Sequence, residues 1–130
     1  MDLFLDYALK KGINLNIPDG GRQTAFHYAC MHGSLDVVKL FVEKIPKELL
    51  NVNQLNEEGL SPLHLACYGN QPETVRYLLE LPNHLGLNLN VRDISWWTPL
   101  HLASAFGHYK VVEILLEASL QKEINHKQSW

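Results

Sequence analysis

The sequence predicts an all-α solenoid of stacked helix-turn-helix units with projecting, β-hairpin-like fingers. A tetrapeptide of one pattern occurs three times, as TAFH at residues 24–27, SPLH at 61–64 and TPLH at 98–101, with starts 37 residues apart. A fixed period of this size is typical of units that stack, because a single unit cannot bury its own apolar face. The 130 residues, 46% of them hydrophobic, suffice for a core of ordinary size.

Each tetrapeptide predicts the start of a first helix. Its initial Thr or Ser suits an N-cap, and the proline in the second and third copies suits the first helical position, where a missing N–H does no harm. We expect these helices over residues 25–32, 62–68 and 99–106. A residue in the left-handed conformation should end each of them, at Gly33, Asn70 and Gly107.

A second helix is expected in each unit, because one apolar pattern recurs with spacings of three and four that place its side chains on one buried stripe. The stripe consists of Val37, Val38, Leu40, Phe41 and Val42; Thr74, Val75, Tyr77, Leu78 and Leu79; and Val111, Val112, Ile114, Leu115 and Leu116. Phe4, Leu5, Tyr7, Ala8 and Leu9 fit the same template, so the chain is predicted to open half-way through a unit. An Asn-rich tripeptide follows each second helix, at 14–16, 51–53 and 88–90, and the period lands again on Asn125.

On these residues the chain resembles the ankyrin repeat family. The motif TPLHLA stands almost unaltered at residues 61–66 and 98–103, and GHxxVVxxLL stands at 107–116. The resemblance implies a single ankyrin repeat domain over residues 1–130. We expect a partial repeat at 1–20, repeats at 21–56 and 57–93, and a repeat with a C-terminal remnant at 94–126.

The chain departs from the family pattern in two places. Its units exceed the usual length of about 33 residues, and the excess at residues 45–50 and 81–87 predicts longer loops after the second helices. Trp96 stands where the family usually has a hairpin glycine, as Gly59 does in the preceding unit. This difference predicts an altered turn in the third finger.

The histidines and cysteines argue against a chemical site. His27, His64 and His101 occupy one position in successive units, ~8 to 10 Å apart, whereas a Zn–N bond is ~2.0 Å long, so they are not expected to share a metal ion. The resemblance implies that each imidazole bonds the hydroxyl of its own cap or a neighbouring loop. Cys30 and Cys67 are expected to lie too far apart for a disulfide and to be buried free thiols.

Composition and motifs exclude further classes of function. There is no nucleophile placed beside a base and no glycine-rich phosphate loop, so we predict no catalytic residue, no cofactor and no enzymatic activity. A net charge of -3 gives no basic surface for nucleic acid or an anionic membrane. No apolar run approaches the ~18 residues of a membrane span, and the acidic N-terminus does not fit a secretory signal, so a cytoplasmic or nuclear location is expected.

In ankyrin stacks the partner usually meets the fingertips and the concave face of the first helices, so the resemblance implies a non-catalytic module that binds a protein partner. By register, the predicted partner-binding residues are Met31, Leu55, Leu60, Tyr68, Ile94, Trp96, Trp97 and Phe106. Aromatic and Met side chains are enriched at interface centres. Neighbours in an extended hairpin point to opposite faces, so at least one of Trp96 and Trp97 should be exposed, either to bind or to shield the tip while the other packs.

Two alternatives remain open at this point. The chain starts inside one unit and stops before the next cap is due at position 135, which favours a regulatory or targeting segment of a larger multidomain enzyme, channel or effector. Its apolar end units would then be partly open and able to self-associate. The resemblance also implies that Asn16, Asn53 or Asn90 could be a substrate of an asparaginyl hydroxylase.

Overall fold

The computed structural model describes residues 17–46, 49–82 and 85–128, with side chains as far as residue 121. These residues form six helices: α2 (Ala25–His32), α3 (Leu35–Lys44), α4 (Pro62–Tyr68), α5 (Pro72–Leu79), α6 (Pro99–Ala105) and α7 (Tyr109–Gln128). The all-α repeat fold predicted from the sequence is therefore confirmed. The helix predicted around Phe4 and the first Asn-rich tripeptide lie outside the described residues.

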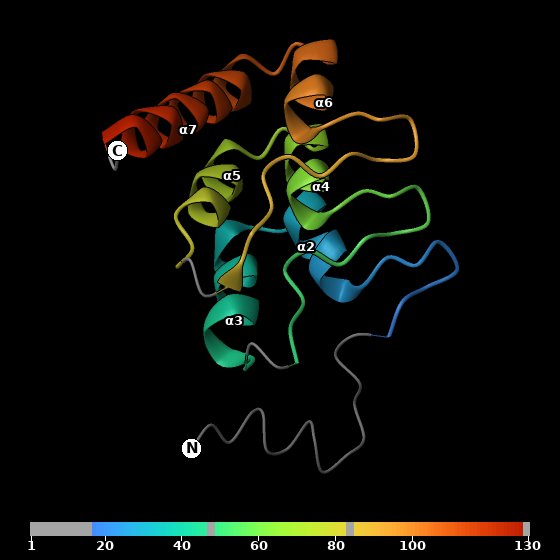
Figure 1. The fold of residues 1–130 in the computed structure, drawn as a ribbon. Helices are drawn as coiled ribbons and strands as arrows, with labels where there is room; N and C mark the ends of the chain where they lie inside the picture. Colours follow the sequence, from blue (N-terminus) through green and yellow to red (C-terminus); the bar gives the residue numbers. More distant parts are fainter. Residues whose placement is uncertain (1–16, 47–48, 83–84, 129–130) are drawn as a thin grey trace.

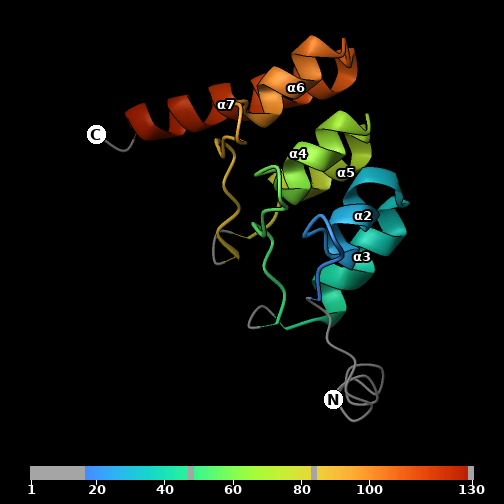
Figure 2. The same cartoon turned by 90° about the vertical axis from the view of Figure 1, so that its right-hand side faces the viewer.

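The helices form three pairs that stack in chain order (Figure 2). The inner helices α2, α4 and α6 pack on one another in one row, and the outer helices α3, α5 and α7 form a second row beside it (Figure 1). Small side chains allow the inner helices to approach closely, because Cys30, Ala66, Cys67 and Ala103 have no exposed surface. The core runs without interruption between the two rows.

The inner helices begin as the tetrapeptides predict. Thr24, Ser61 and Thr98 have extended backbones, and each side-chain oxygen accepts a hydrogen bond from the N–H of the histidine three residues later. That histidine returns a bond, since its Nδ1 accepts from the N–H of the cap at 2.9 to 3.1 Å. Each inner helix therefore starts with a reciprocal capping box in which His takes the place usually held by Glu or Gln.

The predicted ends of the inner helices are correct in two units and wrong in one. Asn70 and Gly107 have φ angles of 55° and 68°, which are left-handed. Gly33 is extended instead, with φ of -75° and ψ of 164°. The reason is that α2 continues for one residue more than α4 and leaves through an extended Gly33 and Ser34, whose hydroxyl then caps α3.

The predicted stripe on the outer helices is buried only in part. Val38, Val75 and Val111 have no exposed surface, but Val37, Leu40 and Leu116 are exposed. The residue that corresponds to Val37 in α5 is Thr74, which is buried. Val111 holds the same position in α7 and is buried as well, because α5 and α7 each follow an outer helix in the stack, α3 and α5 respectively, whereas α3 follows none among the described residues.

The expectation that Asn125 follows the last outer helix is wrong, because α7 continues to Gln128. Pro46 and Pro82 stand just beyond the last residues of α3 and α5, and proline disfavours helix at the residue before it. No proline or glycine interrupts residues 109–128. With good helix formers in place of these breakers, the third outer helix extends past the point at which the others stop.

The three fingers comprise residues 17–23, 54–60 and 91–97, and they project from the side of the inner row (Figure 1). Asp19, Asn56 and Asp93 organise them identically, because each Oδ1 accepts hydrogen bonds from the backbone N–H groups two and four residues later. The prediction of an altered third turn is wrong. Trp96 has a φ of 69°, close to the 77° of Gly59, and its N–H donates to the Asp93 carbonyl as that of Gly59 does to Asn56.

Candidate partner-binding groove

A groove of about 480 Å³ runs between the second and third fingers and the inner helices. It is lined by Gln23, Met31, Asn56, Glu58, Leu60, Leu65, Tyr68, Asp93, Ser95, Trp97, Leu102 and Phe106. These residues come from α2, α4 and α6 and from all three fingers. The stacking of units thus creates one surface that no single unit contains, and we call it the inner groove.

The sequence predicted five of the lining residues, namely Met31, Leu60, Tyr68, Trp97 and Phe106. The aromatic members are exposed over 48% of Tyr68, 38% of Trp97 and 54% of Phe106. The rings of Tyr68 and Phe106 meet edge to face, with centres 5.2 Å apart. Their helices α4 and α6 therefore present a continuous aromatic edge to the groove.

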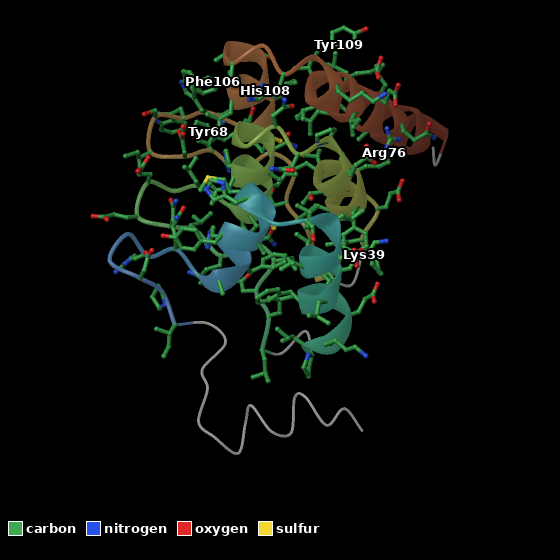
Figure 3. All side chains as sticks on the ribbon, turned by 180° about the vertical axis from the view of Figure 1, so that it is seen from behind. Lys39, Tyr68, Arg76, Phe106, His108 and Tyr109 are labelled. Atoms are coloured by element: carbon green, nitrogen blue, oxygen red, sulfur yellow. The ribbon has the colours of Figure 1, made fainter. Side chains whose placement is uncertain are left out.

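His108 holds this aromatic edge in place from behind. Its ring stacks on that of Phe106, with centres 6.1 Å apart and planes 20° apart, and its Nε2 lies 3.1 Å from the carbonyl oxygen of Tyr68 (Figure 3). The corresponding bond one unit earlier joins Gln71 Nε2 to the carbonyl oxygen of Met31 at 3.1 Å. In both units the chain entering the outer helix is therefore bonded to the inner helix of the preceding unit.

The other three predicted residues lie at the fingertips, outside the groove lining. Leu55, Ile94 and Trp96 are all exposed, Trp96 over 70% of its surface. The Arg92 guanidinium lies over the Trp96 ring, 5.5 Å from its centre. Both adjacent tryptophans are thus exposed, with Trp97 facing the groove and Trp96 outside it.

Buried histidines fix the fingers that form the groove walls. His64 Nε2 lies 2.8 Å from the carbonyl oxygen of Trp97, and His27 Nε2 lies 3.3 Å from that of Leu60. Since Nδ1 of each ring accepts the N–H of its cap, Nε2 carries the proton and donates. Each of these histidines therefore ties its own helix start to the finger of the next unit, which agrees with the role that the family resemblance implied.

The fingers are also bonded to one another along their backbones. The N–H of Glu57 donates to the carbonyl of Gly21 at 2.8 Å, and the N–H of Ile94 donates to that of Glu58 at 3.0 Å. These bonds keep the three fingers in register, so the groove walls are ordered without a ligand.

Two family comparisons agree with this architecture. Residues 44–128 match a family model described as ankyrin repeats (3 copies), and residues 1–42 match one described as ankyrin repeats (many copies). The chain belongs to the ankyrin repeat family. Ankyrin repeats are generally protein–protein interaction modules, and domains built from them are typically non-catalytic. No curated protein shows a significant match to the chain.

The ankyrin histidines differ in environment at the end of the stack. His27 and His64 have no exposed surface, whereas His101 is exposed. His101 keeps the capping box with Thr98, but no further finger follows it in the described part of the chain. Burial lowers the pKa of His27 and of His64 from the ordinary value of 6.5, so both rings are held neutral.

The two cysteines of the ankyrin core are buried free thiols, as the sequence predicts. Burial raises the pKa of Cys67 to about 12 and raises that of Cys30 as well.

Among the described residues, no three or more His, Cys, Asp and Glu side chains are grouped closely enough to hold a metal ion. Within the same ranges, no helix has both the length and the hydropathy needed to cross a bilayer.

Sequence reasoning missed Asn56, Asp93 and Ser95, which belong to the polar half of the inner groove. Glu58 and Asp93 line it, together with the neutral side chains of Gln23, Asn56 and Ser95. A usable signal existed, because Asp19, Asn56 and Asp93 share the 37-residue period and are residues that often organise turns. The apolar stripe alone therefore described only one wall of the site.

The Asn-rich tripeptides serve the loops of the ankyrin stack. Asn53 Nδ2 donates to the carbonyl of Gly86 at 2.8 Å, and Asn53 Oδ1 accepts from the N–H of Asn88 at 2.9 Å. The side chain thus joins the loops of neighbouring units. Asn90 is exposed, Asn16 lies outside the described residues, and hydroxylation of any of them stays a prediction.

Proposed function

We propose that the chain is a non-catalytic recognition module that binds a protein partner through the inner groove, with the fingertips as a second part of the contact. The observation that supports this most is that Met31, Leu60, Tyr68, Trp97 and Phe106, from successive units, line a single groove of about 480 Å³. Exposed apolar surface of this kind is favourable to cover, and aromatic side chains dominate the centres of protein interfaces.

The ordering of the site supports the same proposal. The carbonyl of Trp97 is held by His64, and its N–H is held by Asp93 at 2.9 Å. A partner that docks on walls fixed in this way orders few additional groups, so less of its interaction energy is offset by lost entropy. Trp97 and Phe106 are expected to contribute most, because both are exposed aromatic residues of the lining, one in the third finger and one at the C-cap of α6.

The proposal can be tested by photo-crosslinking followed by affinity measurement. The photoreactive amino acid p-benzoylphenylalanine would replace Phe106 in one variant and Leu120, an exposed apolar residue of α7, in the control. The protein captured only by the Phe106 variant would then be purified and titrated by calorimetry against the parent chain. We expect Trp97→Ala and Phe106→Ala each to weaken its binding at least tenfold, as interface hot spots do, with little change in the unfolding midpoint.

Leu120→Ala provides the matched control, since it removes an exposed apolar side chain from an outer helix. It should leave the affinity unchanged. Equal affinity for the parent, Trp97→Ala and Phe106→Ala would contradict the proposed site. A large loss of stability in Trp97→Ala with unchanged affinity would assign Trp97 to packing.

A further inference from the structure

We propose that the partner segment held in the inner groove carries a Lys or Arg side chain directly beside a large apolar side chain. This inference rests on the proposed function and names the chemistry that the groove selects. Two carboxylates, those of Glu58 and Asp93, stand among the apolar lining residues. No Lys or Arg is among the lining residues in the described part of the chain.

The Asp93 carboxylate is fixed in position. Its Oδ1 accepts from the N–H groups of Ser95 at 2.8 Å and Trp97 at 2.9 Å, and the residue is already half-buried. Because the finger backbone holds this group, the carboxylate cannot turn away when a partner covers the groove. Whatever fills the groove must therefore meet a fixed negative charge beside the exposed ring of Trp97.

Glu58 places a second carboxylate on the neighbouring finger. Its carbonyl accepts the N–H of Ile94 in the third finger at 3.0 Å, so the two fingers that carry these acids are joined at this point. Both acids line the same groove. The negative charge is thus concentrated between the fingers, while Tyr68 and Phe106 contribute the apolar helix side.

The energetics of covering the groove favour a basic occupant over the alternatives. A wholly apolar segment would remove water from two carboxylates and give them no opposite charge in return, which is unfavourable. An acidic or phosphorylated segment would be repelled by them. A Lys or Arg offsets the desolvation, and its methylene stem can lie along apolar surface while the charged end meets the carboxylates.

The aromatic rings add a second reason to expect a cation. Lys and Arg are attracted to the faces of Trp, Tyr and Phe. Such contacts are already present among the described residues, with Arg92 over Trp96 at 5.5 Å and Lys39 over Tyr77 at 5.7 Å. Trp97 and Tyr68 offer further exposed aromatic surface in the groove itself.

The test uses a random 12-residue peptide library displayed on phage and selected against the full chain. Selected peptides are expected to contain Lys or Arg next to Leu, Ile, Met, Phe or Trp more often than peptides selected against a Phe106→Ser chain. Synthetic peptides from the selection, and copies with each Lys or Arg replaced by Gln, would then be titrated by calorimetry.

Asp93→Asn is the decisive variant. Asn56 makes the same two Oδ1 hydrogen bonds in the second finger, so an amide at position 93 should keep the turn while removing the charge. We expect Asp93→Asn and Glu58→Gln each to weaken the basic peptides about fivefold to tenfold, with a smaller effect at 0.5 M NaCl. The peptides in which Lys or Arg is replaced by Gln should bind these variants and the parent chain with equal affinity. Glu57→Gln, next to Glu58 but outside the lining, is the matched control and should change little.

The outcomes separate the two proposals. Peptides that lose binding with Phe106→Ser but are insensitive to Asp93→Asn and Glu58→Gln would overturn this inference and leave the groove as the binding site. Selection of acidic or purely apolar peptides would overturn it as well. Peptides that bind Phe106→Ser as well as the parent, or a selection that yields no enrichment over that variant, would count against the proposed function itself.

Discussion

Trp96 and Gly59 occupy the same place in successive fingers and share a left-handed backbone, with φ angles of 69° and 77°. Glycine adopts this conformation freely, whereas an L-residue with a Cβ is disfavoured there by ~1 to 2 kcal/mol. Burial of the Trp96 side chain offsets little of this free-energy cost, because the side chain is 70% exposed. Arg22 holds the corresponding place in the first finger with a φ of 62°, so the left-handed position belongs to the turn of each finger, and Trp96 bears the cost of a Cβ there.

Replacing Trp96 with glycine should therefore relieve strain. Ser95→Gly is the matched control, since Ser95 lies in the same turn, is exposed, and has no positive φ. Both variants add similar freedom to the unfolded chain, so their difference isolates the backbone term. We expect Trp96→Gly to be more stable than Ser95→Gly by about 1 kcal/mol in urea unfolding. Equal or reversed stabilities would show that the Trp96 turn is not strained.

Gly69 is required by close packing between units. A Cβ at this position would lie 2.3 Å from the carbonyl oxygen of Met31, at the end of the neighbouring inner helix. We expect Gly69→Ala to destabilise the chain by about 1 to 3 kcal/mol, as overpacking does. Gly20→Ala is the control, because a Cβ there meets nothing within 4 Å, and it should change the free energy of unfolding by less than about 0.5 kcal/mol. The free energies of unfolding of the two variants, measured by thermal or urea denaturation, test this prediction.

Local chemistry explains what the sequence predicted well. The caps Thr24, Ser61 and Thr98 and their histidine partners lie within four residues of each other, so the start of each inner helix is encoded in one short segment. Repetition at a fixed period then places these segments side by side. The same logic predicted five residues that line the inner groove, but it also included Leu55, Ile94 and Trp96, which lie outside the lining, and it did not predict Leu65 and Leu102.

Features that depend on neighbouring units were harder to predict. Burial of an outer-helix residue depends on what packs beside it, so Thr74 and Val111 are buried against the outer helix of the preceding unit, while Val37 at the same position is exposed. The length of α7 depended on the absence of a proline near the end of the pattern, as found after α3 and α5. Trp96 follows the glycine-like turn because Asp93 organises that turn as Asn56 organises the preceding one.

The buried thiols should be unreactive in the native protein. Burial disfavours the thiolate, raising the pKa of Cys67 to about 12, and the thiolate is the reactive form. At pH 7.5 we expect Cys30 and Cys67 to react with Ellman's reagent only after the chain unfolds, so that the rate of unfolding limits the rate of the reaction. A Ser104→Cys variant, with its thiol on an exposed position of α6, should gain one rapidly reacting group. Rapid reaction of the parent chain would show that the core between the inner helices opens without global unfolding.

Stability should fall as the pH drops below about 6.5, because of His27 and His64. Burial is the main cause of their lowered pKa values and outweighs the opposing effects of the Leu60 and Trp97 carbonyls and of Asp19 and Asp93. In the unfolded chain both rings bind protons near pH 6.5. The unfolded state therefore takes up more protons than the native state below that pH, and the linkage relation requires the free energy of unfolding to decrease as the pH falls.

The pH effect can be assigned by combining both substitutions, His27→Gln and His64→Gln. A Gln amide can still donate to the finger carbonyl, but it does not titrate. The double variant should be less stable than the parent at pH 7.5, yet its unfolding midpoint in urea should change less between pH 7.5 and 5.5. His32→Gln, which alters an exposed histidine, should keep the parent's pH dependence. If the double variant also keeps that dependence, then protonation of groups other than His27 and His64 causes the loss of stability at low pH.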